Sequence, residues 1–423
     1  MSRILGKYDY NMKGQATGRI LKGQKDLDLR VSLLEGNSSN LTWDRISAIV
    51  KAGKAQNYFK VGDQISTKWK DTQTNTEYDI PLDVVAFRNV VTLDENNQEK
   101  TVPGMILQWH YCSPFGVQFS QNQAFYVCAE ALAAGKYYFE IGSNWGTHCH
   151  QGYKYEFTTT QEVPAGGHLL LGKSNSEVSA LPDTNPSDWR VRTYSSADST
   201  TPIETLSLTE YSIGTPTGTS LGSLSTNTKY NTTLNNLYSS GYGHNRWKNS
   251  ALRQFLNSDA TKGNWFSLPD DDVFARKPAE LSTKDGFLKG VEEELLAVIN
   301  PVKVSTAINT NRDSEIGTWD YTYDKFFIPS LEEVYCSPQI EGEGAYWDYW
   351  KEKSGTSTPN AQWSTNANMI TYGADNHTSA QTVRLRSAYR GGSYYTWNVN
   401  SSGYVTYGNA TNSYRFAPAC VIC

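Results

Sequence analysis

The sequence predicts an α+β protein whose mixed domain is interrupted by a β-rich insertion. Three observations lead to this class. Apolar residues recur with helical spacing in several short segments, other segments alternate with the period of a strand, and the stretch from about 124 to 211 is almost wholly strand-like. The chain has 423 residues, of which 38% are hydrophobic, with 12 Trp and 27 Tyr. This is enough apolar material for two or three packed units.

The first part of the chain contains a polar segment followed by a helix and strands. Residues 1–42 carry scattered Lys and Arg with little periodicity, which is typical of an attachment arm or of a solvated tail. Thr42 is a suitable N-cap and Gly53 a suitable stop for a helix whose apolar face consists of Trp43, Ile46, Ile49 and Val50. Strands are expected near 64–69, 83–93 and 105–111. Residues 43–123 therefore form a first domain segment.

The middle of the chain, 124–228, predicts a β-sandwich-like insertion and a linker. Strand patterns at 137–141, 153–158 and 168–171 are separated by Gly and Pro. The passage 212–228 is rich in Ser, Thr, Gly and Pro, which is the composition of a linker. A mixed pattern returns in 229–423, with helical stripes at 246–257 and 287–299, a strand at 325–328 and a helical turn at 329–334.

The C-terminal segment 388–415 has the composition of a recognition surface. It contains six Tyr, four Asn, four Ser, four Gly and three Thr, and no Lys, Asp, Glu, Gln or Met. Tyr provides a large contact area with few rotors to freeze, and Ser, Gly and Asn adapt their hydrogen bonds, which is why antibody loops use the same residues. The alternative is an edge hairpin, rich in Tyr, that only covers its own core.

The same segment has the pattern of a β-hairpin. Trp397 and Val399 alternate with polar residues, the turn residues of 400–403 follow, and Val405 resumes the apolar positions. We expect five apolar residues to hold the sheet, namely Leu385, Trp397, Val399, Val405 and Phe416. Strict alternation places Tyr395 and Tyr407 on the same side as Trp397, so either a bulge shifts the register or these two tyrosines belong to the core.

Composition and motifs exclude several classes of function. The net charge of −5 and the absence of a basic stripe argue against nucleic acid as a partner. No apolar run approaches the ~20 residues that span a membrane, and the N-terminus lacks an apolar signal core. Six Cys are too sparse for a disulfide scaffold. His148 to His150 and Asp270 to Asp272 are weak metal signals, so we expect no metal site and no cofactor.

Several segments carry a resemblance to a known family. NRWKNSALRQFLN (245–257), DKFFIPSLEEV (324–334), VRLRS (383–387) and YRFAPAC (414–420) resemble the C-type-lectin-fold proteins that retroelements diversify in phages and bacteria. YFKVGD (58–63), DVVAF (83–87) and MILQW (105–109) are similar to opening strands of related phage proteins. The resemblance covers most of 43–115 and 229–423. It implies a C-type lectin fold that is split by the insertion.

The resemblance also implies which residues vary. In that family a reverse transcriptase randomises template adenines, mostly in Asn-type codons, which reach Tyr, Ser, Gly, Asp, His, Arg, Ala and Thr but not Trp, Lys, Glu, Gln or Met. The segment 388–415 obeys this restriction except at Trp397, which would be a fixed frame residue. The implied ligand-binding positions are Ala388, Tyr389, Arg390, Ser393, Tyr394, Tyr395, Asn398, Asn400, Ser402, Tyr404, Thr406, Tyr407 and Gly408. All of these should point outward, and exposure is favoured more strongly for Tyr394 and Tyr404 than for Tyr395 and Tyr407.

The implied function is non-covalent ligand binding. A retroelement-diversified receptor-binding protein of a phage tail would bind a protein or glycan on the bacterial surface. Its other partners would be phage tail subunits and, in a homo-oligomer, further copies of the chain. It would be made in the bacterial cytoplasm and carried on the virion, with the bacterial cell surface as the alternative location.

Two alternatives stay open. The first is an invariant phage structural protein of the same fold, whose Tyr residues mediate subunit packing. The second is an oxidative enzyme related to the formylglycine-generating enzymes, which resemble this fold and use paired cysteines. Residues three apart on a strand point to opposite faces, which argues against joint action of Cys420 and Cys423. We therefore expect a binding protein and not an enzyme.

Overall fold

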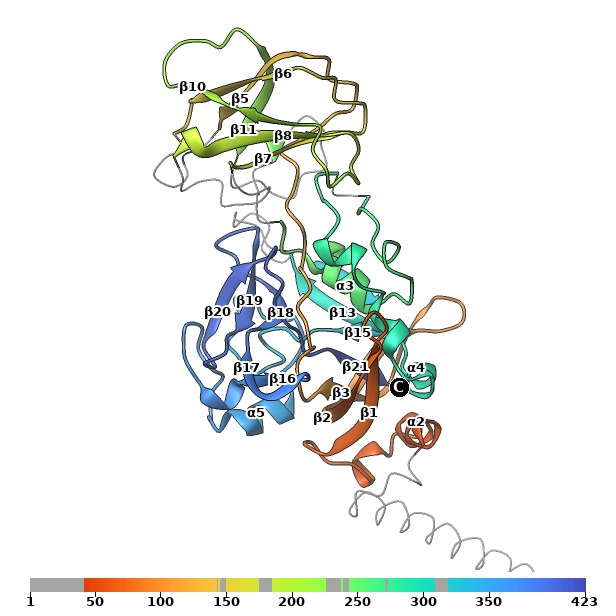
Figure 1. The fold of residues 1–423 in the computed structure, drawn as a ribbon. Coiled ribbons are helices and arrows are strands. Elements are labelled where there is room, and N and C mark those ends of the chain that lie inside the picture. The colour runs from red at the N-terminus through yellow and green to blue at the C-terminus, as the bar shows by residue number, and fades with distance from the viewer. Residues whose placement is uncertain are drawn as a thin grey trace, which may run out of the picture.

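The protein consists of a mixed α+β body and a separate β lobe (Figure 1). The computed structural model describes residues 42–142, 144, 150–174, 185–225, 237–238, 243–270, 273–308 and 319–423. The predicted arm at 1–42 lies outside these residues except for Thr42, as do His148, Cys149, Asp271 and Asp272. Two large apolar cores are present in the described part of the chain, one in the body and one in the lobe, beside two small clusters. The predicted α+β class is confirmed.

The body is built on a seven-stranded antiparallel sheet, counted over the described residues. Its order is β14 (Trp319–Asp324), β13 (Val302–Ala307), β2 (Thr76–Leu93), β3 (Glu99–Trp109), β21 (Ala419–Ile422) and β15 (Phe326–Phe327), with β1 (Gln64–Asp71) paired to β2. The last strand lies inside the sheet, where Cys420 is in register with Leu107 on one side and Phe326 on the other. The segments before and after the insertion thus share one sheet.

Short helices cover the body. They are α2 (Trp43–Lys51), α3 (Ala251–Leu256), α4 (Glu293–Val298) and α5 (Asp348–Ser354), with 3₁₀ turns η2 (Ala55–Asn57), η4 (Trp247–Asn249), η5 (Ala279–Ser282), η6 (Phe287–Gly290) and η8 (Ala367–Met369). The helix expected after Thr42 is confirmed, because the Thr42 hydroxyl accepts a hydrogen bond from the Arg45 amide. Trp43, Ile46 and Val50 are buried as predicted, and Ile49 is half-buried.

Two predicted helices are shorter than the apolar stripes suggest. Ser250 interrupts 246–257, because its backbone is extended and its hydroxyl caps the Arg253 amide at the start of α3. Gly290 interrupts 287–299, since the chain there passes so close to β1 that a Cβ would lie 2.2 Å from the Lys70 carbonyl oxygen. The helical turn expected at 329–334 is a turn that ends at Tyr335, which has a φ of 58°.

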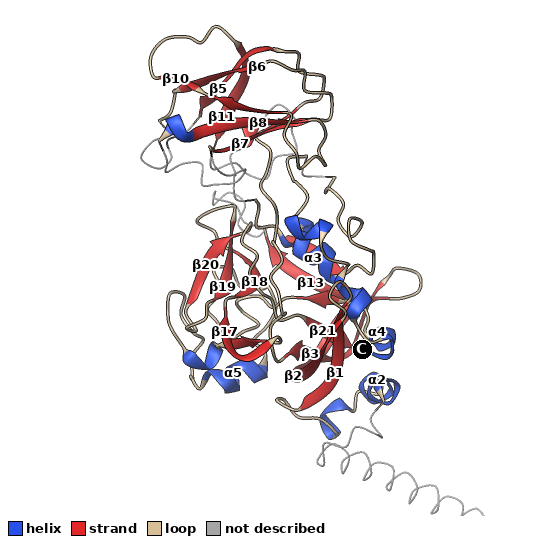
Figure 2. Ribbon diagram, in the orientation of Figure 1, coloured by secondary structure: helices blue, strands red, loops and turns tan. Residues whose placement is uncertain are grey.

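The lobe contains two sheets over an apolar core of its own (Figure 2). One is β10 (Thr209–Tyr211), β6 (Lys154–Thr159), β5 (Gly135–Ile141), β11 (Thr219–Ser225) and β12 (Leu237–Tyr238). The other is β4 (Tyr126–Val127), β7 (His168–Lys173), β8 (Trp189–Tyr194) and β9 (Glu204–Ser207), with η3 (Pro186–Asp188) before β8. The prediction of a linker at 212–228 was wrong in part, because β11 lies within this range and its Leu221 and Leu224 are buried. No described helix has the length and apolar character that crossing a membrane requires.

Two small sheets complete the body on the side away from α2 (Figure 1). One is the pair β16 (Thr371–Gly373) and β17 (Asn376–Gln381). The other is the antiparallel sheet β18 (Val383–Ala388), β19 (Tyr395–Val399) and β20 (Val405–Asn409). This second sheet and the two loops that connect its strands contain all the residues that the sequence assigns to ligand binding.

Candidate functional site

The predicted C-terminal hairpin is confirmed as β19 and β20. The two strands pair from Tyr395 opposite Asn409 to Val399 opposite Val405 without a shift in register. The Asn400 side chain closes the turn by accepting hydrogen bonds from the amides of Ser402 and Tyr404 at 2.9 and 3.0 Å. Turn chemistry that can be read in the sequence therefore fixes which residues oppose one another.

The residues expected to hold the sheet are buried. Leu385, Trp397, Val399, Val405 and Phe416 are each at most 6% exposed, and all belong to the core of the body. This confirms the frame predicted from the apolar alternation.

Tyr395 and Tyr407 fit neither of the two expectations, which were a bulge that shifts the register or two tyrosines in the core. There is no bulge between β19 and β20, and Tyr407 lies directly opposite Trp397. Both tyrosines are therefore on the Trp397 side of the hairpin, yet both are only half-buried. This side of the hairpin belongs to the core near Val399 and reaches the surface near Tyr395. One face of the hairpin therefore contributes both to the core and to the surface.

The exposed end of this face is a continuous group of rings. We call it the aromatic cluster, and it consists of Trp363, Tyr389, Tyr394, Tyr395, Trp397 and Tyr407. Tyr389 and Tyr407 are stacked with ring centroids 4.2 Å apart, and Tyr395 lies 4.3 Å from both Tyr394 and Tyr407. Adjacent rings support one another by offset and edge contacts. The cluster thus forms a semi-rigid platform of uncharged side chains.

The sequence interpretation missed Trp363. This residue is 45% exposed, and its ring lies 5.2 Å from Trp397 and 5.3 Å from Tyr407. Main-chain hydrogen bonds hold it beside β20, from the Trp363 amide to the Val405 carbonyl and from the Val405 amide to the Ser364 carbonyl. The one signal in the sequence is that 355–374 contains no Lys, Arg, Asp or Glu and has the same polar composition as the tail.

Asn245 holds the loop between β18 and β19. Its side-chain amide donates to the carbonyl oxygens of Gly392 and Tyr395 at 3.0 and 2.8 Å, and to that of Tyr389 at 3.4 Å. Its own backbone amide donates to the Ser393 carbonyl at 2.9 Å. Asn245 is 4% exposed, so these bonds are protected from water. Each accepting atom is a main-chain atom, which every amino acid supplies.

Gln339 holds the same loop from another direction. Its side-chain oxygen accepts from the Arg390 backbone amide at 2.9 Å and from the Trp397 indole nitrogen at 3.1 Å. The first partner is again a main-chain atom, and the second is the predicted frame residue. Asn245 and Gln339 therefore fix the path of 389–395 without using any side chain that is proposed to vary.

The opposite face of the hairpin contains three candidates that are less accessible than expected. Asn398 is 1% exposed and lies in register with the buried Arg384, so it is removed from the contact surface. Gly408 is buried against Tyr414, whose ring would lie 2.5 Å from an added Cβ. Thr406 pairs with Asn398 and is half-buried. Alternation separates these residues from the aromatic cluster.

The remaining candidates lie at the two ends of the hairpin. Ala388, Arg390 and Ser393 are half-buried in the loop beside the aromatic cluster. Ser402 is exposed, and Asn400 and Tyr404 are half-buried, at the turn at the other end. The structure thus brings Tyr389, Tyr394, Tyr395 and Tyr407 together and places Tyr404 apart from them.

Buried charges lie below the loop. Arg386 pairs with Glu333 through both guanidinium nitrogens and donates to the Glu343 carbonyl. Glu343 accepts from the Ser387 hydroxyl and from the Ala307 amide. Burial raises the pKa of Glu343 to about 7, although the Ser387 hydrogen bond and the nearby Arg386 oppose the shift. This network anchors the end of β18 to the body.

The cysteines of the closing strand are poorly suited to thiolate chemistry. Cys420 and Cys423 are 1% and 5% exposed, both are free thiols, and burial raises the pKa of each. Among the described residues no group of three or more His, Cys, Asp or Glu side chains is placed to hold a metal ion. The candidate surface therefore offers aromatic contact and hydrogen bonding.

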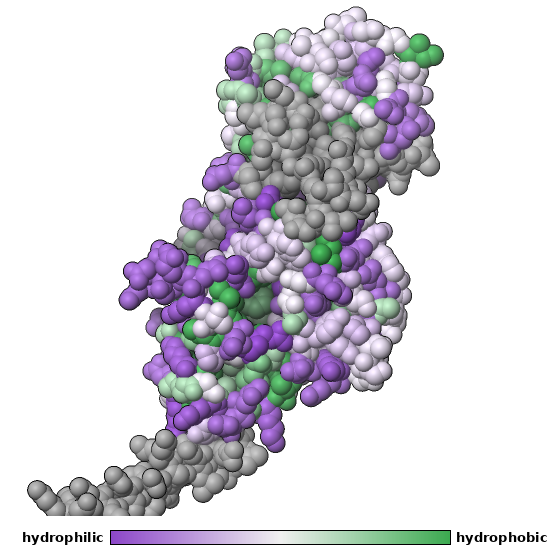
Figure 3. Space-filling model, turned by 180° about the vertical axis from the view of Figure 1, so that it is seen from behind, coloured by the Kyte–Doolittle hydropathy of each residue, from purple (hydrophilic) through white to green (hydrophobic). Residues whose placement is uncertain are grey.

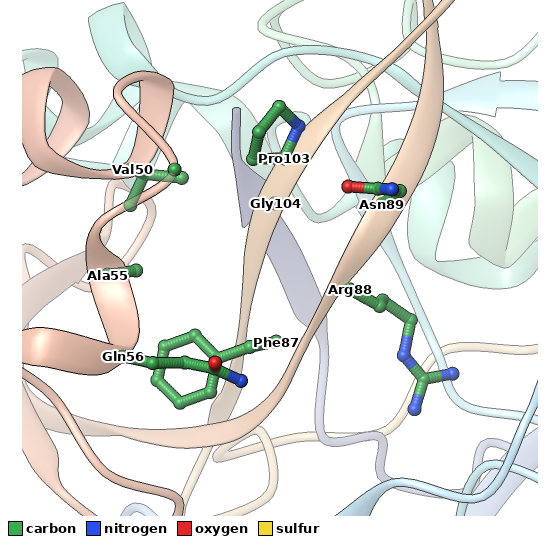
Figure 4. A pocket seen from close by; sticks show the side chains of 9 residues that line it. Val50, Ala55, Gln56, Phe87, Arg88, Asn89, Pro103 and Gly104 are labelled. Carbon is green, nitrogen blue, oxygen red and sulfur yellow. The ribbon is translucent and has the colours of Figure 1, made fainter.

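A hollow of about 310 Å³ lies elsewhere, between α2 and the strands β2 and β3. Figure 4 shows Arg88 and Asn89 on one side of it and Val50 and Gln56 on the other. The Arg88 guanidinium donates hydrogen bonds to the carbonyl oxygens of Ala345 and Tyr346, so it attaches β2 to this segment. None of the predicted ligand-binding residues lines this hollow.

Residues 222–423 match the model of a family described as a domain of unknown function, DUF6273. The match begins within β11 and contains Asn245, Gln339, Trp363 and the complete hairpin. No curated protein and no solved structure matches the chain.

Proposed function

We propose that the loop 388–395 and the aromatic cluster form a variable ligand-binding surface on a C-type-lectin-like body. The protein would be a receptor-binding protein of a phage tail that is diversified by a retroelement. It would bind a protein or glycan on the bacterial surface, next to other tail subunits or further copies of itself. The bacterial cell surface is the alternative location.

One observation carries this proposal. The loop is held by side chains of Asn245 and Gln339 that bond to its main-chain atoms. A main-chain bond is indifferent to the side chain at the same residue, so the loop keeps its path when its side chains change. A surface that only packed against its own core would need particular side chains at these positions.

The composition of the surface supports the same function. The exposed ring of Trp363 and the half-buried Tyr rings beside it give large contact areas at a small entropic cost, and the residues around them are Ser, Gly, Asn and Thr. Individual contacts of this kind are modest, and repeated display on one particle raises the overall affinity by orders of magnitude.

Sequencing of the gene's surroundings tests the proposal. We expect a neighbouring reverse transcriptase gene and an imperfect copy of the 3′ end that differs only at adenines. These differences should fall in codons of half-buried loop residues such as Tyr389 and Tyr394, and they should spare Asn245 and Trp397. A locus with neither feature would contradict diversification and favour an invariant structural protein of the same fold.

A further inference from the structure

The ring of Trp363 is held at the surface at a conformational cost. Trp363 has a φ of 65°, in the left-handed region that bulky side chains rarely occupy. Such a conformation is unfavourable for a bulky residue and persists where the surrounding structure enforces it, often at functional sites. Gly or Asn would fit this backbone with less strain. An exposed Trp at such a position points to a use for its ring.

The two chain segments that supply the aromatic cluster carry almost no charge. The segment 355–374 has no Lys, Arg, Asp or Glu, and Arg390 is the sole charged residue of 388–413. Figure 3 views the molecule from behind, so the hairpin side of the body, which is on the left in Figure 1, is on the right. This right-hand part of the lower body is mostly pale, which marks residues of intermediate hydropathy. Arg390 is the one charged side chain of these two segments, so an acidic ligand would gain a single partner charge and a cationic ligand would gain none. The surface is therefore suited to a neutral ligand.

We propose that Trp363 is a fixed stacking anchor for a neutral saccharide. This inference rests on the proposed function, because it assigns a ligand class to the same surface. A pyranose ring has a flat face of C–H groups that packs on an indole ring, and a rim of hydroxyls that pairs with neutral polar groups. A protein epitope of ordinary size, with about 20–30 residues, would present charges that this surface leaves unpaired.

The position of Trp363 divides the surface into constant and variable parts. Trp is outside the set of residues that adenine changes in Asn-type codons produce, and Trp363 lies outside 388–415. Tyr389 and Tyr407, which contact its ring edge-on at 6.1 and 5.3 Å, lie inside that segment. The anchor would bind any neutral sugar ring, and the changing neighbours would select its linkage and substituents.

The variants for the test are chosen so that loss of the Trp363 ring can be distinguished from loss of the folded structure. Trp363→Gly removes the ring and suits the left-handed backbone, so the body should keep most of its stability. Trp363→Phe keeps a smaller ring. Tyr321→Ala is the control, because Tyr321 is a 53% exposed aromatic on β14, outside the aromatic cluster. Melting temperatures of the full-length variants report whether each one folds.

Binding is measured with defined saccharides by saturation-transfer NMR. The neutral probes are maltohexaose, laminarihexaose and chitotetraose, and trigalacturonic acid is the acidic probe. We expect at least one neutral probe to bind, at least tenfold more weakly to Trp363→Gly, with an intermediate loss for Trp363→Phe and no change for Tyr321→Ala. Absence of neutral binding, equal binding of the acid, or an unaffected Trp363→Gly variant would overturn the inference.

Whole bacteria separate this inference from the proposed function. A panel of strains is treated with periodate, which destroys sugar diols, or with proteinase K, and then tested for binding of the full-length protein. Loss of binding after periodate alone supports both proposals. Loss after proteinase K alone supports attachment and overturns the saccharide. Binding to the probes but to no strain keeps the saccharide site and contradicts the attachment function, and binding to neither sinks both.

Discussion

The buried ring of Trp397 packs against the exposed ring of Trp363 with ring centroids 5.2 Å apart. One residue belongs to the hairpin core and the other to its surface, so the contact joins the frame to the proposed binding surface. Stability and binding should therefore respond differently to changes at neighbouring positions, and matched substitutions can separate them.

Truncation of Trp397 should damage the fold, whereas truncation of Tyr404 should not. Trp397 is fully buried and its indole nitrogen donates to Gln339, so Trp397→Ala should cost about 3–5 kcal/mol of unfolding free energy. Tyr404 is half-buried at the turn, and Tyr404→Ala should change stability by about 0.5 kcal/mol. Thermal denaturation followed by circular dichroism measures both. A large loss in Tyr404→Ala would assign that residue to the core.

Removal of the Asn245 side chain should loosen the loop. Asn245→Ala removes the side-chain donor to the carbonyls of Gly392 and Tyr395, which keep only the main-chain amides of Tyr395 and Tyr389 as donors. Each lost hydrogen bond typically costs about 0.5–1.5 kcal/mol. Faster hydrogen exchange should appear across 389–395 and not in β3. Asn264→Ala is the control, since Asn264 is exposed and bonds only to a neighbouring turn residue. Unchanged exchange in the loop would show that Asn245 does not hold it.

Position 398 should reject side chains that position 402 accepts. Asn398 is buried beside Arg384, so Asn398→Tyr forces extra volume into a packed region and should cost about 1–3 kcal/mol. Ser402 is exposed, and Ser402→Tyr should stay within about 0.5 kcal/mol of the parent protein. Equal melting temperatures for the two variants would return Asn398 to the variable surface.

Stability should fall between pH 4.5 and 7 because of Glu343. Burial raises its pKa to about 7 in the folded protein, against 4.5 for an unperturbed Glu. Its contribution is complete below pH 4.5 and is lost as the pH rises through 7, by an amount on the order of 3 kcal/mol. Glu343→Gln should remove this decline, as measured by the melting temperature of the body at pH 5 and pH 7.

His168 provides the opposing control. Burial lowers the pKa of His168 to about 3, so its contribution is present above pH 6.5 and is lost as the pH falls toward 3. His168 belongs to the lobe and Glu343 to the body, and hydrogen exchange can follow the two cores separately. Identical pH profiles for the parent and Glu343→Gln bodies would contradict the assignment.

Local patterns predicted the parts of the fold that depend on neighbouring residues. The cap at Thr42, the hairpin turn at Asn400 and the buried side of β19 each follow from a few adjacent residues. The breaks at Ser250 and Gly290 were not predicted, because an apolar stripe continues through a break when both pieces face the same core.

The supports of the candidate site could not be read from the sequence for a different reason. Asn245, Gln339 and Trp363 act through contacts with residues far away in the chain. Bonds from a side chain to main-chain atoms impose no residue type on the partner, so they leave no pattern in the partner segment. The alternation of apolar residues correctly placed Tyr395 and Tyr407 on the same side of the hairpin as Trp397. It could not show that this end of the side lies at the surface, because that depends on which other segments pack against it.

Sequencing many gene copies from a single population distinguishes a fixed frame beneath a changing surface from an invariant protein. We expect adenine-directed changes concentrated at exposed and half-buried positions of 388–407, with Asn245, Gln339, Trp363 and Trp397 identical in every copy. Copies that are uniform throughout, or that differ as often at these four residues as in the loop, would rule out a fixed frame beneath a diversified surface.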